Sequence, residues 1–225
     1  MGKKHRSSKS YGKSFIILPI IFLLGTYLII FTAFGSTISF ISDAAGMVFS
    51  DSEKDYSTGY KNIFVPVAEN KEGLKAGDIE FPQYGQQFGE LLIKDCDINT
   101  KLFFGDNDIA LRNGVGIYNG SSVPGFGSTV LVGGHNNTYF HNLKDVKKGM
   151  TVQIHTNYGN YEYKITDTKV LQEKDSSAYD ITADKENLVM YTCYPFDELG
   201  LTSQRFFVYA DYVSGPQVDT SVEED

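Results

Sequence analysis

The sequence predicts a mostly β domain that follows a single N-terminal transmembrane helix. From Phe81 onward, short runs of alternating apolar and polar residues are separated by turn residues, the pattern of a β-sandwich or β-barrel. The chain has 22 glycines and 6 scattered prolines, which suits a domain with many turns. Upstream, Phe15 to Phe34 is a run of twenty uncharged residues, and at about 1.5 Å per residue it spans about 30 Å, the thickness of the hydrocarbon core of a membrane.

A basic N-terminal tail sets the expected orientation of this helix. Five of the first fourteen residues are basic and none is acidic: Lys3, Lys4, Arg6, Lys9 and Lys13. Because positive residues stay in the cytoplasm, we expect a cytoplasmic tail at 1–14, an anchor at 15–34 and the rest of the chain outside the cell membrane. A cleaved signal peptide is the alternative, but the apolar run is long for one and no clear A-x-A site follows it. The net charge of -8 argues against a nucleic-acid partner.

The remaining chain divides into a linker, a domain and a tail. Residues 35–80 are small and polar with weak periodicity, and we expect an extracellular linker with one short helix at 39–48. The domain is expected over 81–215 and a polar acidic tail over 216–225. Within the domain, the pattern predicts strands at 89–94, 98–104, 128–134, 150–156, 160–172, 187–193 and 204–213, short helices or turns at 106–114 and 137–146, and a hairpin turn at 157–161.

The sequence has no motif for a nucleotide, metal or cofactor. The glycine-rich run at 113–120 does not link a strand to a helix and lacks the Lys-Ser/Thr of a phosphate-binding loop, so we expect its glycines in turns. Neither His-Glu-x-x-His nor Cys-x-x-Cys occurs, and we expect no zinc site. Acidic residues gather at 172–186, where a solvated loop is the simpler interpretation and calcium activation stays open. We therefore expect no cofactor.

Cys193 lies where an apolar strand meets a turn, and it can be a nucleophile, a disulfide partner, a metal ligand or inert packing. Cys96 is the other cysteine, and its place between two apolar runs favours a buried, inert side chain. A nucleophilic thiol needs a base or a cation nearby. His135 follows a buried strand and two glycines, which places an imidazole at the rim of the sheet. Arg205 begins the strand after Cys193, and an antiparallel pairing of the two strands brings it close to the thiol.

Two segments together resemble the sortases. The histidine segment reads TVLVGGHNNTYFHNLKDVKKGMTVQIHTNYGNYEYKIT, and the cysteine and arginine segment reads LVMYTCYPF…SQRFFVYA. The order His, Cys, Arg and their spacings fit that family, and the resemblance covers roughly residues 85–213. The TCYPF sequence and the absence of a C-terminal anchor are most similar to class D.

This resemblance implies a membrane-anchored cysteine transpeptidase on an eight-stranded β-barrel with short helices. Such enzymes cut a surface protein at an LPXTG-like C-terminal sorting signal, hold it as a thioester and pass it to an amine of a peptidoglycan precursor. It implies that Cys193 is the nucleophile, that His135 moves the proton and that Arg205 positions the substrate. Thr192, beside the nucleophile, is expected to bind substrate or the oxyanion.

Three other readings of the sequence compete with this one. A papain-like or caspase-like protease would carry the motif of its own family around the cysteine. Neither Cys-Gly-Ser-Cys-Trp nor Gln-Ala-Cys-x-Gly occurs here, and an arginine takes the place of the asparagine that orients the histidine. A pilin-polymerising, class C-like sortase would usually carry a lid motif or a C-terminal span, and neither is evident. A non-catalytic anchored adhesin or receptor domain would explain the anchor and the β pattern, but not His135, Cys193 and Arg205 together.

Overall fold

The computed structural model describes residues 17–28, 62–196 and 202–221. The chain divides into two compact units, Met1–Lys54 and Asp55–Asp225. In the first unit, residues 17–28 form a helix, while the rest of the expected 15–34 anchor and the expected helix at 39–48 lie outside the described residues. Within the described parts of the chain, no helix combines the length and the apolar character needed to cross a membrane.

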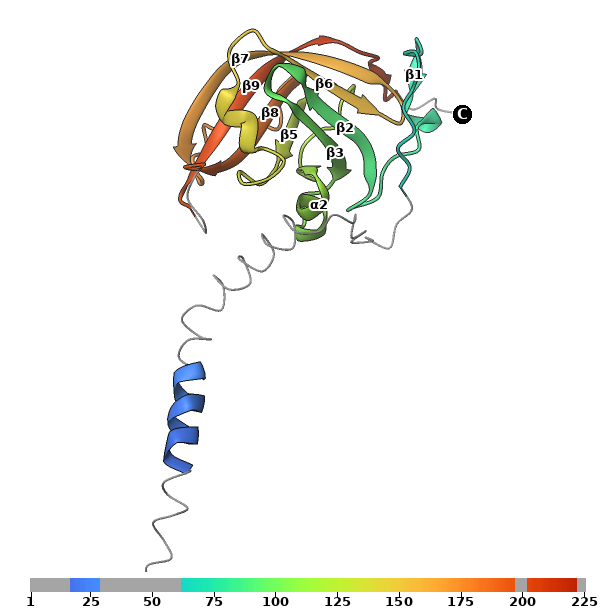
Figure 1. Ribbon diagram of the computed structural model, residues 1–225. Coiled ribbons are helices and arrows are strands. Elements are labelled where there is room, and N and C mark those ends of the chain that lie inside the picture. The colour runs from blue at the N-terminus through green and yellow to red at the C-terminus, as the bar shows by residue number, and fades with distance from the viewer. Residues whose placement is uncertain (1–16, 29–61, 197–201, 222–225) are drawn as a thin grey trace, which may run out of the picture. The chain divides into compact units, whose positions relative to one another are not determined.

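The second unit is built on a closed barrel of eight strands in the order β2-β3-β4-β5-β8-β9-β7-β6 (Figure 1). The expected eight-stranded barrel is therefore confirmed. Its strands are β2 Gln87–Ile93, β3 Ile98–Phe104, β4 Val115–Ile117, β5 Thr129–Gly133, β6 Thr151–Thr156, β7 Asn160–Gln172, β8 Asn187–Tyr194 and β9 Gln204–Ser214. The short helices are η1 Ala76–Asp78, η2 Lys94–Cys96, α2 Asp108–Asn113 and η3 His141–Asp145.

The seven strands expected from the alternation lie within two residues of those observed at each end, and the eighth, β4, was not expected. It is only three residues long and lies in the glycine-rich run read as turns. Gly116 pairs with Gly133 of β5, and a Cβ added to Gly116 would come within 2.2 Å of the Gly105 carbonyl oxygen. Glycine is needed there because the two backbone segments approach closely. The same glycines that made this segment look like turns therefore allow the strand to pair.

Alternating side chains give β8 and β9 two buried faces. Leu188 and Met190 of β8 point into the barrel core, where Val208 of β9 also packs. Val189 lies on the outer face in a second cluster that contains Leu131, Ala178 and Phe207. Ala178 belongs to the loop between β7 and β8, so this loop covers part of the outer face. The apolar run of β8 follows from burial on both sides.

Segments expected as linker and tail also pack on the barrel. β1 (Leu74–Lys75), labelled beside the barrel in Figure 1, pairs in parallel with β10 (Val218–Asp219). Leu74 and Val218 are 7% and 8% exposed and belong to the core. The compact part therefore extends beyond the expected limits at 81 and 215. Single apolar residues in polar segments give no period, which is why the sequence pattern did not reveal them.

Candidate active site

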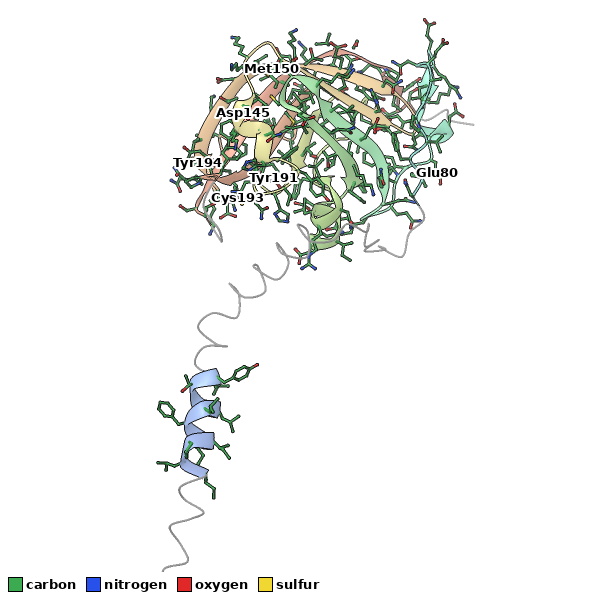
Figure 2. The ribbon with its side chains drawn as sticks, viewed as in Figure 1. Glu80, Asp145, Met150, Tyr191, Cys193 and Tyr194 are labelled. Atoms are coloured by element: carbon green, nitrogen blue, oxygen red, sulfur yellow. The ribbon has the colours of Figure 1, made fainter. Side chains whose placement is uncertain are left out.

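Three neighbouring strands bring His135, Cys193 and Arg205 to one end of the barrel. β5 and β8 are parallel with Gly133 opposite Tyr191. His135 lies two residues beyond Gly133, and Cys193 lies two residues beyond Tyr191, so the histidine and the cysteine are at the same level. β8 and β9 are antiparallel with Cys193 directly opposite Arg205. Figure 2 shows Tyr191, Cys193 and Tyr194 grouped at this end of β8, across the view from Glu80.

Cys193 and Arg205 lie on the outer face of the barrel. Side chains alternate along a strand, so Cys193 shares the face of Val189, which is in the outer cluster. Arg205 shares the face of Phe207 for the same reason. Phe206 and Val208 pack against the inner core. The thiol and the guanidinium therefore start from paired positions on one surface.

The two cysteines differ in exposure. Both are free thiols; Cys96 is 7% exposed in the core, whereas Cys193 is half-buried. Burial raises the pKa of the Cys96 thiol, and the charges of Asp145 and Asp95 raise it further. A thiol that resists ionisation is a poor nucleophile. The environment of Cys96 thus fits the inert role expected for it.

His135 is half-buried beside α2, the short helix between β3 and β4. Burial lowers the pKa of His135; the charge of Asp108 raises it and that of Arg112 lowers it. The neutral imidazole is therefore the resting form at neutral pH, ready to accept a proton. The sequence pattern did not reveal these α2 neighbours, since they precede the histidine by more than twenty residues.

The two glycines before His135 make room for aromatic rings of the protein itself. A Cβ added to Gly133 would lie 2.8 Å from the hydroxyl of Tyr191. A Cβ added to Gly134 would lie 2.6 Å from the ring of Phe140. Packing against Tyr191 and Phe140 therefore requires small residues at these two positions.

Thr192 links the cysteine strand to the residue before the histidine. Its side chain is 1% exposed, and its hydroxyl donates a hydrogen bond of 2.7 Å to the carbonyl of Gly134. The Gly134 amide in turn donates to the Tyr191 carbonyl at 3.2 Å. The Thr192 hydroxyl is therefore engaged within the protein and is not directed to a substrate. A contact of its backbone with an oxyanion stays a prediction.

Arg205 is held by its own protein. Nη1 donates to the carbonyls of Thr202 and Gln204 at 2.7 and 2.9 Å, and Nη2 donates to Oε1 of Glu173 at 2.6 Å. The Arg205 side chain is 13% exposed and that of Glu173 is 52% exposed. Glu173 follows β7, and its amide donates to the Ser203 carbonyl. The sequence pattern gave no signal for Glu173, which reaches Arg205 through the β7–β9 pairing.

The other described histidines form hydrogen bonds with groups other than Cys193. His155 pairs with Glu90 across β6 and β2 at 3.0 Å. Nδ1 of His141 bonds the Asn136 carbonyl at 3.0 Å. Among the residues that the structure describes, no group of three or more His, Cys, Asp and Glu side chains could hold a metal ion. In the 173–186 loop, the Asp175 carboxylate accepts from Ser177 and that of Asp180 from Thr182.

The family model and the known proteins that are similar to this chain all belong to one family. The family model described as the sortase domain matches residues 91–213. The chain is 30% identical over 158 residues to sortase D of Bacillus subtilis, which covers 70% of this chain and 76% of that protein. It is also 30% identical over 121 residues to sortase A of Listeria monocytogenes, covering 52% and 53% respectively.

Solved structures share the fold. Sortase A of Listeria monocytogenes aligns with a TM-score of 0.51 at 25% identity, covering 61% of this chain and 92% of that chain. A sortase D5 transpeptidase of Clostridium perfringens aligns with a TM-score of 0.54 at 20% identity, covering 61% and 86%. At that identity the second match speaks for the barrel alone.

Proposed function

The chain belongs to the sortase family, whose members are cysteine transpeptidases, and from this premise we propose that it transfers surface proteins to a cell-wall amine. The substrate would carry an LPXTG-like signal near its C-terminus. A solved structure of Clostridium perfringens sortase C is described as containing the C-terminal cell wall sorting motif. That protein is 23% identical to this chain, so its ligand guides the proposal only as a class of peptide.

In the first half-reaction, Sγ of Cys193 attacks the carbonyl carbon of the scissile peptide bond. The carbon–sulfur bond forms, and the carbon–nitrogen bond breaks. The leaving amine takes a proton from His135, which has received it from the thiol. Because His135 is neutral at rest, it can accept that proton. The products are a thioester on Cys193 and a free C-terminal fragment.

In the second half-reaction, an acceptor amine attacks the thioester carbonyl. The new amide bond forms, the carbon–sulfur bond breaks, and His135 takes the proton of the amine before returning it to the thiolate. Arg205 supports this chemistry from the position paired with Cys193. It orders the backbone before β9 and places positive charge beside the reacting carbonyl.

The observation that carries the proposal is the register of the three strands. Parallel pairing of β5 with β8 and antiparallel pairing of β8 with β9 bring one imidazole, one thiol and one guanidinium to the same edge. These are the three groups that the chemistry needs. Neither His141 nor His155, whose partners are Asn136 and Glu90, takes the position of His135.

The direct test uses the full-length protein in detergent with fluorogenic Leu-Pro-x-Thr-Gly and Leu-Pro-x-Thr-Ala peptides. We expect cleavage of at least one peptide, a mass adduct on Cys193 without an acceptor, and a ligated product with one. Cys193→Ala and His135→Ala should be essentially inactive, and Cys96→Ala should retain activity. Cleavage that survives in Cys193→Ala would refute the mechanism.

Location and acceptor complete the proposal. The uncharged residues 15–34 behind five basic residues support a single-pass anchor with a cytoplasmic N-terminus and an extracellular catalytic domain. Protease treatment of intact protoplasts should then digest the barrel and spare the N-terminal end. A peptidoglycan-precursor amine is the proposed acceptor. Faster ligation to a lysine side chain of a pilin subunit would instead indicate pilus assembly.

A further inference from the structure

Asn136, the residue after His135, is bound to the turn that follows Cys193. It is 8% exposed, and its side-chain amide donates a hydrogen bond of 3.0 Å to the carbonyl of Pro195. A polar side chain so buried is rarely accidental, because an unmet amide would cost free energy. The bond joins segments that are 59 residues apart in the chain.

This bond lies beyond the end of the strand pairing. The β5–β8 pairing stops at Gly133 and Tyr191, one residue short of Gly134 and two short of His135. Beyond this point, the Thr192 hydroxyl donates a hydrogen bond to the Gly134 carbonyl, and the Asn136 side chain donates one to the Pro195 carbonyl. One hydrogen bond therefore lies on each side of His135, and their partners lie on each side of Cys193.

The backbone of Asn136 is fixed as well. Its carbonyl oxygen can only accept, so Nδ1 of His141 carries the proton in their 3.0 Å hydrogen bond. Nε2 of His141 is then the acceptor for the Lys144 ammonium at 2.7 Å. This chain of contacts anchors Asn136 from η3, the helix that follows the loop. The Asn136 side chain thus starts from a fixed backbone when it reaches Pro195.

We infer that Asn136 is a positioning residue that keeps the imidazole of His135 in register with the thiol of Cys193. The inference rests on the proposed function of these two groups as a catalytic pair. Asn136 itself touches no reacting atom, so its loss should act through geometry. A displacement of about 1 Å between reacting groups can lower a rate about a hundredfold.

The test compares Asn136→Ala with Asn137→Ala in the full-length protein. Asn137 is the same residue type in the same loop, and no side-chain bond to the cysteine turn is found for it in the described parts of the chain. For Asn136→Ala we expect kcat to fall about ten- to a hundredfold with KM changed less than about twofold. Asn137→Ala should leave both within about twofold of wild type.

A second readout does not depend on the peptide. Iodoacetamide labelling of Cys193 is followed over time by mass spectrometry at neutral pH, with buried Cys96 as the internal reference. A neutral imidazole within reach of the thiol can take its proton, so displacing it in Asn136→Ala should slow the labelling of Cys193. Asn136→Asp keeps the shape but loses the donor and opposes the Pro195 carbonyl, so it should be at least as impaired.

The two readouts separate this inference from the proposed function. If wild type cleaves no peptide but the labelling of Cys193 is slower in Asn136→Ala and not in Asn137→Ala, the proposed substrate is wrong and the positioning role stands. An unchanged kcat and an unchanged labelling rate in Asn136→Ala would overturn the role. A lower melting temperature with normal kcat and labelling below the transition would also overturn it, because Asn136 would then serve stability alone.

Discussion

Arg205 donates hydrogen bonds to three acceptors within the protein, and a residue that replaces it would have to make the same bonds. The guanidinium reaches two backbone carbonyls through Nη1 and the Glu173 carboxylate through Nη2. A planar group with donors on several nitrogens can serve the three acceptors at once, whereas an ammonium is a single compact point. The role of Arg205 therefore includes holding Thr202 and Gln204 at the start of β9.

We predict that Arg205→Lys loses about two orders of magnitude in kcat/KM while it remains folded, and that Arg205→Ala loses more. Glu173→Gln keeps an acceptor for Nη2 and should lose less than Arg205→Lys. Steady-state cleavage of the peptide gives the rates, and a melting curve of each variant checks the fold. Near-normal turnover of Arg205→Lys would mean that only its positive charge matters.

The protonation of His135 is a second residue-scale property with a definite sign. Burial lowers its pKa below the ordinary value of 6.5, so the unfolded chain takes up a proton before the folded one does. The free energy of unfolding should therefore fall as the pH drops from 6.5 through the lowered pKa. His135→Gln should lack this part of the pH dependence. Urea midpoints at several pH values would show the difference.

Asp108 and Arg112 provide the matched test of that pKa. Asp108 raises the pKa of His135, so Asp108→Asn should lower it further, and Arg112→Gln should raise it. An NMR titration of the imidazole measures both shifts. Opposite or absent shifts would show that α2 does not govern the charge of His135.

The positions of the candidate site residues in the fold were easier to predict from sequence than their hydrogen-bond partners. Cys193, His135 and Arg205 stand in local motifs, and the pairing of Cys193 with Arg205 follows from two consecutive antiparallel strands. The contacts of Glu173 with Arg205 and of Asn136 with Pro195 do not follow from local motifs, because the closed barrel brings together segments that are far apart in the chain. No periodicity or spacing encodes a contact between such distant segments.

At the scale of single elements, the end of β5 is where packing and chemistry meet. Gly134 leads into His135, and a methyl group there would press on Phe140 and Val115 at 2.6 and 2.8 Å. Both neighbours are fully buried, so neither can move aside cheaply. The position of the histidine thus depends on the absence of a side chain one residue before it.

We predict that Gly134→Ala destabilises the protein by about 2 kcal/mol through overpacking and lowers kcat by at least about tenfold. Gly77→Ala is the control, since an added Cβ there meets nothing within 4 Å. Urea unfolding and peptide cleavage measure the two effects. If Gly134→Ala behaves like Gly77→Ala, the close packing before His135 has no role in holding the site.

The elements that the sequence predicted are those with enough residues to show a period. β7 has 13 residues and β9 has 11, and both were placed within one residue. β4 has 3 residues, and β1 and β10 have 2 each. Two or three residues cannot display an alternation, so these strands exist because the neighbouring chain offers hydrogen-bonding partners.

For the molecule as a whole, one buried carboxylate joins segments from three parts of the chain. Glu186 is 5% exposed and precedes β8. It accepts hydrogen bonds from the amides of Gly125 and Gly127 and from the Tyr163 hydroxyl. The side chain of Gln217 donates to it as well, which fastens the C-terminal segment that carries β10.

Glu186 lies at the start of β8 and Cys193 near its end, about 20 Å away at the rise of an extended strand. This separation allows stability and chemistry to be tested independently. Glu186→Ala leaves four donors without their acceptor, and each unmet buried donor costs about 1–3 kcal/mol, so we expect a loss of at least about 3 kcal/mol by urea unfolding. The exposed Glu72→Ala should cost less than about 0.5 kcal/mol.

Below the unfolding transition, iodoacetamide should label Cys193 of Glu186→Ala at the wild-type rate, because the hydrogen bonds beside His135 and Cys193 are untouched. Slower labelling in the folded variant would mean that β8 transmits the change along its length, and an unchanged urea midpoint would mean that the four donors find other acceptors.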